Sequence, residues 1–226
     1  MIGILLWAVN IGRVDILLEV SLISSKLVLP RVGHLQAFYR VFGYLNKVTK
    51  SKLYFDPSKP MISEYRLHKF DWEDFYPDAC KPIPLDMSRP GGKYVPNHFF
   101  VDANHAGDKN TRRSMTGILI FCNIAPIIWY SKRKNGVETL TFGPEFTAMN
   151  NSVEMIAALQ YKLRMFGVPI EKSTDILCDN EAVYKNARTP KYQLSKKHHS
   201  ISYHMSREAV ASGAYRMSKE DTDTNL

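Results

Sequence analysis

Three acidic residues of this 226-residue chain stand where secondary-structure elements are expected to begin or end. Asp102 closes a short apolar run, Glu145 falls in the first turn of an expected helix, and Asp179 follows another apolar run. If the two runs are neighbouring strands, their ends converge and the helix start brings Glu145 beside them. Carboxylate oxygens suit Mg²⁺ and also Mn²⁺, and two such ions about 3.5–4 Å apart can clamp both oxygens of a phosphodiester displacement. If the three acids meet, the cluster would suit metal-assisted hydrolysis of a phosphodiester.

The elements that must position these acids follow from hydrophobic periodicity. Apolar positions recur at steps of three and four between Phe146 and Phe166, which predicts a long helix that begins near Gly143-Pro144. A basic helix is expected over 196–211, and short apolar runs predict strands over 98–102, 117–122, 126–131, 174–178 and 215–217. This order indicates a mixed sheet with helices packed on it.

Spacing alone leaves a structural role open for each acid. An Asp at a strand end commonly belongs to a turn, and an acid in the first turn of a helix favourably complements the helix dipole. Periodicity therefore identifies candidates without deciding between catalysis and capping.

A set of ordered motifs carries a resemblance that favours catalysis. Over residues 98–226 the chain resembles the ribonuclease H domain of copia-type (Pseudoviridae-like) LTR retrotransposon Pol polyproteins. The resemblance implies an α/β, ribonuclease H-like mixed five-stranded sheet with flanking helices, in which Asp102, Glu145 and Asp179 are three of four metal-binding carboxylates. The motifs are Val101–Asp108 followed by Arg112–Gly117, then Ile128–Arg133, Thr141–Ala148, Cys178–Ala182 and Lys197–His204 with Arg207-Glu208.

The first segment resembles the C-terminal part of the reverse transcriptase region of the same polyproteins. The matching residues are Ile2–Ala8, Arg13–Ile16, Pro30, His34 and Gly43–Leu45. No Tyr/Phe-x-Asp-Asp sequence occurs, so the polymerase palm is expected to be missing upstream and no polymerase activity is expected.

These observations predict three parts in the chain. Residues 1–56 are expected to be a small, mainly helical remnant of the reverse transcriptase thumb or connection. Residues 57–96 hold seven of the twelve prolines and are expected to be a Pro-rich connector. Residues 97–226 are expected to be the ribonuclease H-like domain, truncated at its C-terminus.

The expected truncation concerns the fourth acid. Copia-type domains place it in an Ala-Asp-x-x-Thr-Lys segment after a stretch that resembles Thr222–Leu226, which ends this chain. Asp221 and Asp223 lie nearby but precede the expected position. The resemblance therefore implies weakened or absent activity, because an incomplete ligand set holds the second ion poorly.

Basic residues could contact the phosphates of an RNA/DNA hybrid. A solvated surface is the alternative for each cluster. The candidates are Arg112, Arg113, Lys132, Arg133, Lys196 and Lys197.

Composition limits the remaining possibilities. A formal net charge of +8 permits a polyanionic partner without establishing one. No apolar run is long enough to span a membrane, and no membrane partner is expected. The three cysteines are odd in number and far apart, which argues against a disulfide scaffold and favours an intracellular location, cytoplasmic or nuclear.

The sequence leaves two functions open. One is a retrotransposon-derived ribonuclease H, a metal-dependent endonuclease that cleaves RNA in RNA/DNA hybrids, impaired here by loss of the fourth carboxylate. The other is a non-catalytic nucleic-acid-binding relic, or a pseudogene product of a transposable element.

Overall fold

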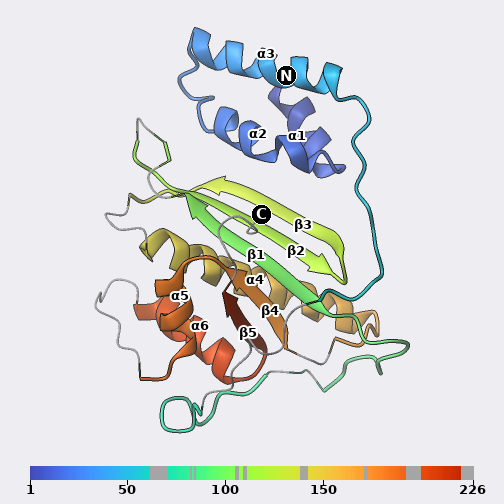
Figure 1. Cartoon of the computed structure of the whole chain (residues 1–226), viewed down its shortest axis with the longest axis vertical. Coiled ribbons are helices and arrows are strands. Elements are labelled where there is room, and N and C mark those ends of the chain that lie inside the picture. The colour runs from blue at the N-terminus through green and yellow to red at the C-terminus, as the bar shows by residue number, and fades with distance from the viewer. Residues whose placement is uncertain are drawn as a thin grey trace.

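The chain folds into an N-terminal group of helices followed by an α/β unit (Figure 1). A computed structural model describes residues 1–61, 71–81, 83, 85–104, 107–108, 111–137, 142–170, 173–191 and 200–219. The N-terminal elements are α1 (Ile2–Asn10), the 3-10 turn η1 (Val14–Ile16), α2 (Leu17–Ser24) and α3 (Val32–Lys47). The α/β elements are β1 (Asn97–Asn104), β2 (Met115–Cys122), β3 (Ala125–Arg133), α4 (Phe142–Met165), β4 (Thr174–Cys178), α5 (Glu181–Arg188), α6 (Ser200–Ala211) and β5 (Tyr215–Lys219).

The five strands form one mixed sheet in the order β3-β2-β1-β4-β5. β1, β2 and β3 pair antiparallel, whereas β4 lies parallel to both β1 and β5. The β2–β3 hairpin turns at Asn123, whose positive φ of 54° suits a residue type that tolerates the left-handed region. The predicted mixed five-stranded sheet with flanking helices is confirmed.

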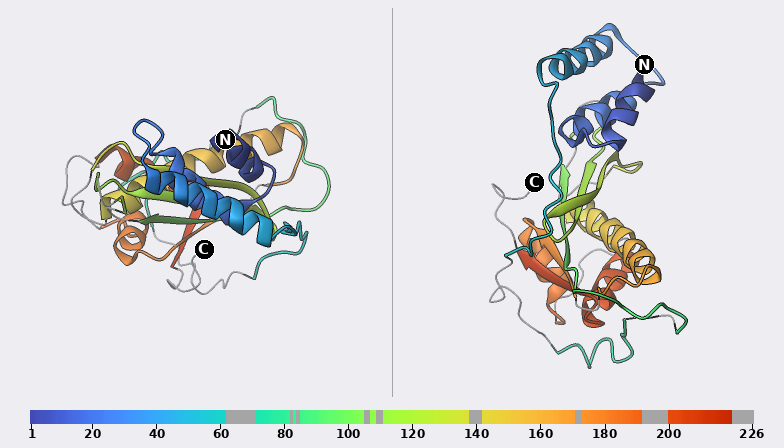
Figure 2. Two further views of the ribbon diagram at one scale, coloured as in Figure 1. Left: turned by 90° about the horizontal axis from the view of Figure 1, so that it is seen from above. Right: turned by 90° about the vertical axis from the view of Figure 1, so that its right-hand side faces the viewer.

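The predicted long helix, α4, packs across β1 and β2 and also contacts α6 (Figures 1 and 2). Its periodic apolar positions up to Ile156 form a buried layer: Phe146, Met149 and Ile156 are each no more than 1% exposed. They share a core with Phe99 and Ile120 of the sheet. This packing fixes the start of α4 against the centre of the sheet. The last expected position, Phe166, follows the end of α4 and is 83% exposed, so the prediction was wrong there.

The N-terminal helices lie at one end of the molecule, where α2 packs on β3 (Figures 1 and 2). They enclose a second buried cluster around Leu5, Val20 and Phe38, against which Trp129 of β3 packs. The division into parts at residues 56 and 96 stays a prediction, and contacts between helices and sheet cross it. No helix among the described ranges is long and apolar enough to cross a membrane.

Candidate functional site

Asp102 lies inside β1, opposite Gly117 of β2, and not at the end of its strand as expected. The strand continues to Asn104 because the pairing with β2 extends to Met115. Burial of Val101 and Ala103 on either side holds this part of β1 in the core. The Asp102 carboxyl is therefore carried by paired, rigid backbone and not by a loop.

Asp179 directly follows β4, as the sequence predicts, and β4 pairs with β1 in parallel. The next residue, Asn180, caps α5: its side-chain oxygen accepts hydrogen bonds from the backbone amides of Ala182 (3.0 Å) and Val183 (3.2 Å). Cys178 before it is buried. Asp179 is thus held between a buried strand end and a capped helix start.

Glu145 lies in the first turn of α4, as predicted. A lysine from the end of the neighbouring hairpin reaches this turn: Lys134 Nζ donates to the backbone carbonyl of Pro144 at 2.6 Å. The helix start is therefore tied to the sheet at the residue before Glu145.

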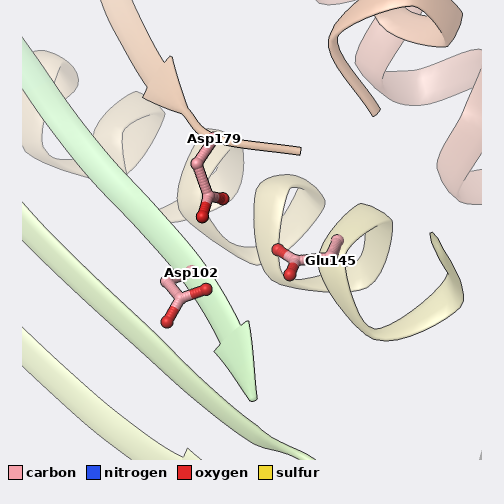
Figure 3. Close-up of side chains that lie close together, drawn as sticks. All are labelled: Asp102, Glu145 and Asp179. Atoms are coloured by element: carbon pink, nitrogen blue, oxygen red, sulfur yellow. The ribbon is translucent and has the colours of Figure 1, made fainter. Parts of the chain in front are cut away.

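The structure brings the three acids together (Figure 3). One carboxylate oxygen from each of Asp102, Glu145 and Asp179 lies within 4.8 Å of the other two. They come from β1, the start of α4 and the end of β4, and their carboxylates point toward one another. Within the described part of the chain these are the three members of this cluster.

The electrostatics of this carboxylate cluster (Asp102, Glu145 and Asp179) favour binding of positive charge. Burial, and then the negative charges of Asp102 and Asp179, raise the pKa of Glu145 to about 8, although Lys134 acts in the opposite direction. The pKa of Asp102 is also raised, first by burial and then by Asp179. Without a cation, one proton is therefore retained near neutral pH, as happens when carboxylates share a partly buried site.

The donor set fits a hard divalent cation. Asp179 Oδ1 is buried and has no hydrogen-bond partner among the described residues. An unpaired buried carboxylate oxygen is costly unless it is compensated, and a bound cation would supply that compensation. All three ligands are oxygens, which matches the preference of Mg²⁺ and Mn²⁺.

Two of the predicted nucleic-acid contacts lie close to the carboxylate cluster. Lys132 and Arg133 line a cavity of about 290 Å³ together with Lys134 and, from α4, Thr147 and Asn151. This basic cavity borders the first turns of α4, two residues from Glu145.

Of the other four predicted contacts, two lie among the described residues and two lie outside them. Arg112 is exposed and Arg113 half-buried in the turn before β2, and their contact with nucleic acid stays a prediction. Lys196 and Lys197 lie outside the described residues, as do Asp221 and Asp223.

Sequence reasoning missed two residues that organise this region. The capping role of Asn180 had a local signal, an Asn immediately before a helical stretch. Asp108 is a buried acid whose partners include Lys26, and such a pairing across 82 positions has no local signature.

Comparison with curated proteins finds retrovirus-related Pol polyproteins of plant transposons. The polyprotein of transposon RE1 from Arabidopsis thaliana is 25% identical over 214 residues, which is 95% of this chain and 12% of that protein. The polyprotein of transposon TNT 1-94 from Nicotiana tabacum is 25% identical over 224 residues, 99% of this chain and 14% of that protein. The predicted resemblance to retrotransposon Pol polyproteins is confirmed, and the copia type is consistent with these relatives.

No family model matches the chain. Among solved structures, LC11-RNase H1 in complex with an RNA/DNA hybrid covers 57% of this chain and 88% of its own, at 12% identity and a TM-score of 0.46. Ribonuclease H1 from Halobacterium salinarum covers 59% of this chain and 89% of its own, at 15% identity and a TM-score of 0.43.

Proposed function

We propose that the chain carries a ribonuclease H-type site, which hydrolyses the RNA strand of RNA/DNA hybrids with divalent cations held by Asp102, Glu145 and Asp179. The observation that supports this most is the meeting of three carboxylates from three separate elements within 4.8 Å. The similarity to Pol polyproteins supports the choice of substrate. Because the chain spans only 12–14% of the length of those two relatives, their other activities are not assigned to it.

The residues of the cluster have distinct tasks in this proposal. Bound Mg²⁺ or Mn²⁺ would supply activation of water and stabilisation of the charge that develops on the phosphodiester oxygens. Asp102 and Asp179 are held by paired or capped backbone and orient the ligand oxygens. Glu145, whose pKa is raised to about 8, gives up its proton when a cation binds. Ligand positions fixed before the reaction reduce the reorganisation that catalysis requires.

The basic cavity next to Glu145 fits a role in holding the substrate backbone. Lys132, Arg133 and Lys134 place cationic side chains along it. Contacts between such groups and phosphates position a nucleic acid without reading its sequence. We therefore propose hybrid binding with little sequence preference and a strong dependence on salt concentration.

The impairment that the resemblance implies stays a prediction. The three carboxylates of the cluster belong to the described part of the chain, and residues 220–226 lie outside it. The predicted cytoplasmic or nuclear location stays a prediction.

The experiment that tests this function compares substrates. The chain is incubated with Mn²⁺ or Mg²⁺ and with an end-labelled RNA strand that is single-stranded, paired with RNA or paired with DNA. We expect internal cleavage of the RNA in the hybrid alone. Hybrid binding without cleavage would contradict the proposal and favour the alternative of a non-catalytic nucleic-acid-binding relic. Neither binding nor cleavage would favour a product without nucleic-acid function.

A further inference from the structure

A buried acid outside the carboxylate cluster joins three parts of the molecule. The side chain of Asp108 is 5% exposed. Its Oδ2 accepts hydrogen bonds from Lys26 Nζ at 2.6 Å, Thr111 Oγ1 at 2.8 Å and Arg133 Nη1 at 2.9 Å. These partners come from the turn after α2, from the turn before β2 and from the end of β3. Removing either cationic partner from a buried carboxylate costs free energy, because negative charge is then left uncompensated in the interior. Asp108 therefore holds these three segments together.

Lys26 reaches Asp108 because the N-terminal helices are packed on β3 (Figure 2). Trp129 Nε1 of β3 donates to the backbone carbonyl of Val9 at 2.9 Å, and Ser21 Oγ of α2 donates to the backbone carbonyl of Ser131 at 2.9 Å. The Trp129 ring packs against the second buried cluster. Lys26 therefore belongs to an extended contact and is not an isolated surface ion pair.

Asp108 also fixes the turn that carries two arginines. Its backbone amide donates to the Arg113 carbonyl at 3.1 Å, and its carbonyl accepts from the Arg112 amide at 2.7 Å. Arg112 has a φ of 54°, a conformation that is unfavourable for a side chain of this size and persists only when its surroundings impose it. The contacts of Asp108 supply those surroundings.

We propose that Asp108 is a positioning residue through which the N-terminal helices set the direction of Arg112 and Arg113 toward the phosphates of the bound hybrid. Lys26 links Asp108 to the N-terminal helices, and Arg133 links Asp108 to the sheet. The part concerning the hybrid rests on the proposed function, whereas the coupling between helices and turn rests on the contacts alone. Asp108 itself does not touch the reacting atoms, because it lies outside the carboxylate cluster.

Two variants of the full chain test this proposal in different ways. Lys26→Met removes the cation supplied by the helices, and Thr111→Val removes the contact within the turn while leaving the helices intact. Lys26→Arg keeps the charge and serves as the conservative rescue. Lys47→Met removes an exposed lysine of α3 and serves as the matched control.

Two measurements distinguish positioning from general destabilisation. Hydrogen exchange without substrate should be faster at the Arg112 amide in Lys26→Met and Thr111→Val, with α4 still protected. In the cleavage assay, the KM for the hybrid should rise about tenfold in both variants, equivalent to about 1.4 kcal/mol, with kcat changed less than about twofold. Lys26→Arg and Lys47→Met should match the parent chain.

Unchanged exchange at Arg112 in Lys26→Met would overturn the coupling between the helices and the turn, whatever the result for Thr111→Val. Faster exchange with an unchanged KM would overturn the role of Asp108 in presenting the arginines. If the parent chain cleaves no hybrid, the proposed function fails; the exchange result still decides whether the helices act on this turn.

Discussion

Lys134 donates from Nζ to the backbone carbonyl of Pro144 at 2.6 Å, which places an ammonium group at the helix turn that carries Glu145. One side chain thus ties the end of the β2–β3 hairpin to the start of α4 and partly offsets the negative charge of the carboxylate cluster. Lys134 lines the basic cavity and also lowers the pKa of Glu145. A substitution of this cavity residue should therefore change the titration of the carboxylate cluster.

Replacing this lysine should alter the titration of the carboxylate cluster. In Lys134→Met the pKa of Glu145 should rise above about 8, because a nearby positive charge that lowers it is lost. Lys134 repels a divalent cation about twice as strongly as it repels a proton, so metal affinity near pH 7 should rise although the displaced proton is held more tightly. Calorimetric titration with Mn²⁺ measures this. Lys132→Met is the matched control, since Lys132 lines the same cavity and, unlike Lys134, has no hydrogen bond to the turn that carries Glu145 among the described contacts. Equal affinities in the two variants would contradict the prediction.

The metal-free protein should lose stability as the pH rises from about 5 to 8. The pKa of Glu145 is 4.5 when unperturbed and about 8 in the folded chain, so the folded state binds more protons than the unfolded state in this window. The free energy of unfolding should therefore fall with rising pH, by at most about 1.4 kcal/mol for each unit of pKa difference. The raised pKa of Asp102 acts in the same direction.

Urea denaturation in chelator at several pH values measures this slope. Glu145→Gln cannot ionise, so its slope should be clearly smaller than that of the parent, and at pH 8 it should be the more stable protein. Addition of Mg²⁺ at pH 8 should stabilise the parent more than the variant, because the cation binds the folded carboxylate cluster. Parallel pH profiles for the two proteins would show that Glu145 does not titrate as described.

The cap of α5 should matter for both stability and metal binding. Asn180→Ala leaves the amides of Ala182 and Val183 without their side-chain acceptor, and such caps contribute about 0.5–2 kcal/mol. Asn180→Ser retains an acceptor and should recover most of the loss. Because Asp179 directly precedes the cap, the alanine variant should also bind Mn²⁺ more weakly. A stability loss without any change in metal affinity would show that the Asn180 cap does not position Asp179 for metal binding.

Substitution of Arg207 should lower the free energy of unfolding more than substitution of most other residues of α6. Its buried guanidinium donates to the backbone carbonyls of Asn186 and Thr189, each at 2.9 Å, and lies 4.7 Å from the ring centroid of Tyr203 and 4.9 Å from that of Trp72. Arg207→Met removes the donor to both carbonyls and the charge that lies over the aromatic rings, so the free energy of unfolding should fall by roughly 2–4 kcal/mol. Arg89→Met, at an exposed position, should change it by less than about 0.5 kcal/mol. Similar losses in both variants would contradict the structural role.

Local pattern predicts most of the α/β unit. The strand over 174–178 has the predicted bounds, and the apolar steps from Phe146 to Ile156 match the buried face of α4, because both signals depend on neighbouring positions. The motifs also identify the three acids that meet. Their spacing alone does not, since an acid at an element end has several ordinary roles.

Contacts between distant segments could not be predicted from the sequence. Asp102 lies inside its strand because the pairing of β1 with β2 continues to Asn104, and that pairing is decided by β2. The partners of Asp108 and the aromatic surroundings of Arg207 depend on packing between elements far apart in the chain. Hydrophobic periodicity does not show which charged side chains, such as those of Asp108 and Arg207, are buried by a segment far away in the chain.

Single-turnover cleavage of an RNA/DNA hybrid during a Mn²⁺ titration is the direct test of a nuclease site built on the carboxylate cluster. Three proteins are compared: the parent chain, Asp179→Asn, and Asp86→Asn, which changes an exposed aspartate. We expect metal-dependent cleavage of the RNA strand by the parent and by Asp86→Asn. In Asp179→Asn the rate should fall at least about a hundredfold, equivalent to about 2.7 kcal/mol of transition-state stabilisation. Cleavage that persists without metal, or an equal rate in Asp179→Asn, would contradict a nuclease site built on the carboxylate cluster.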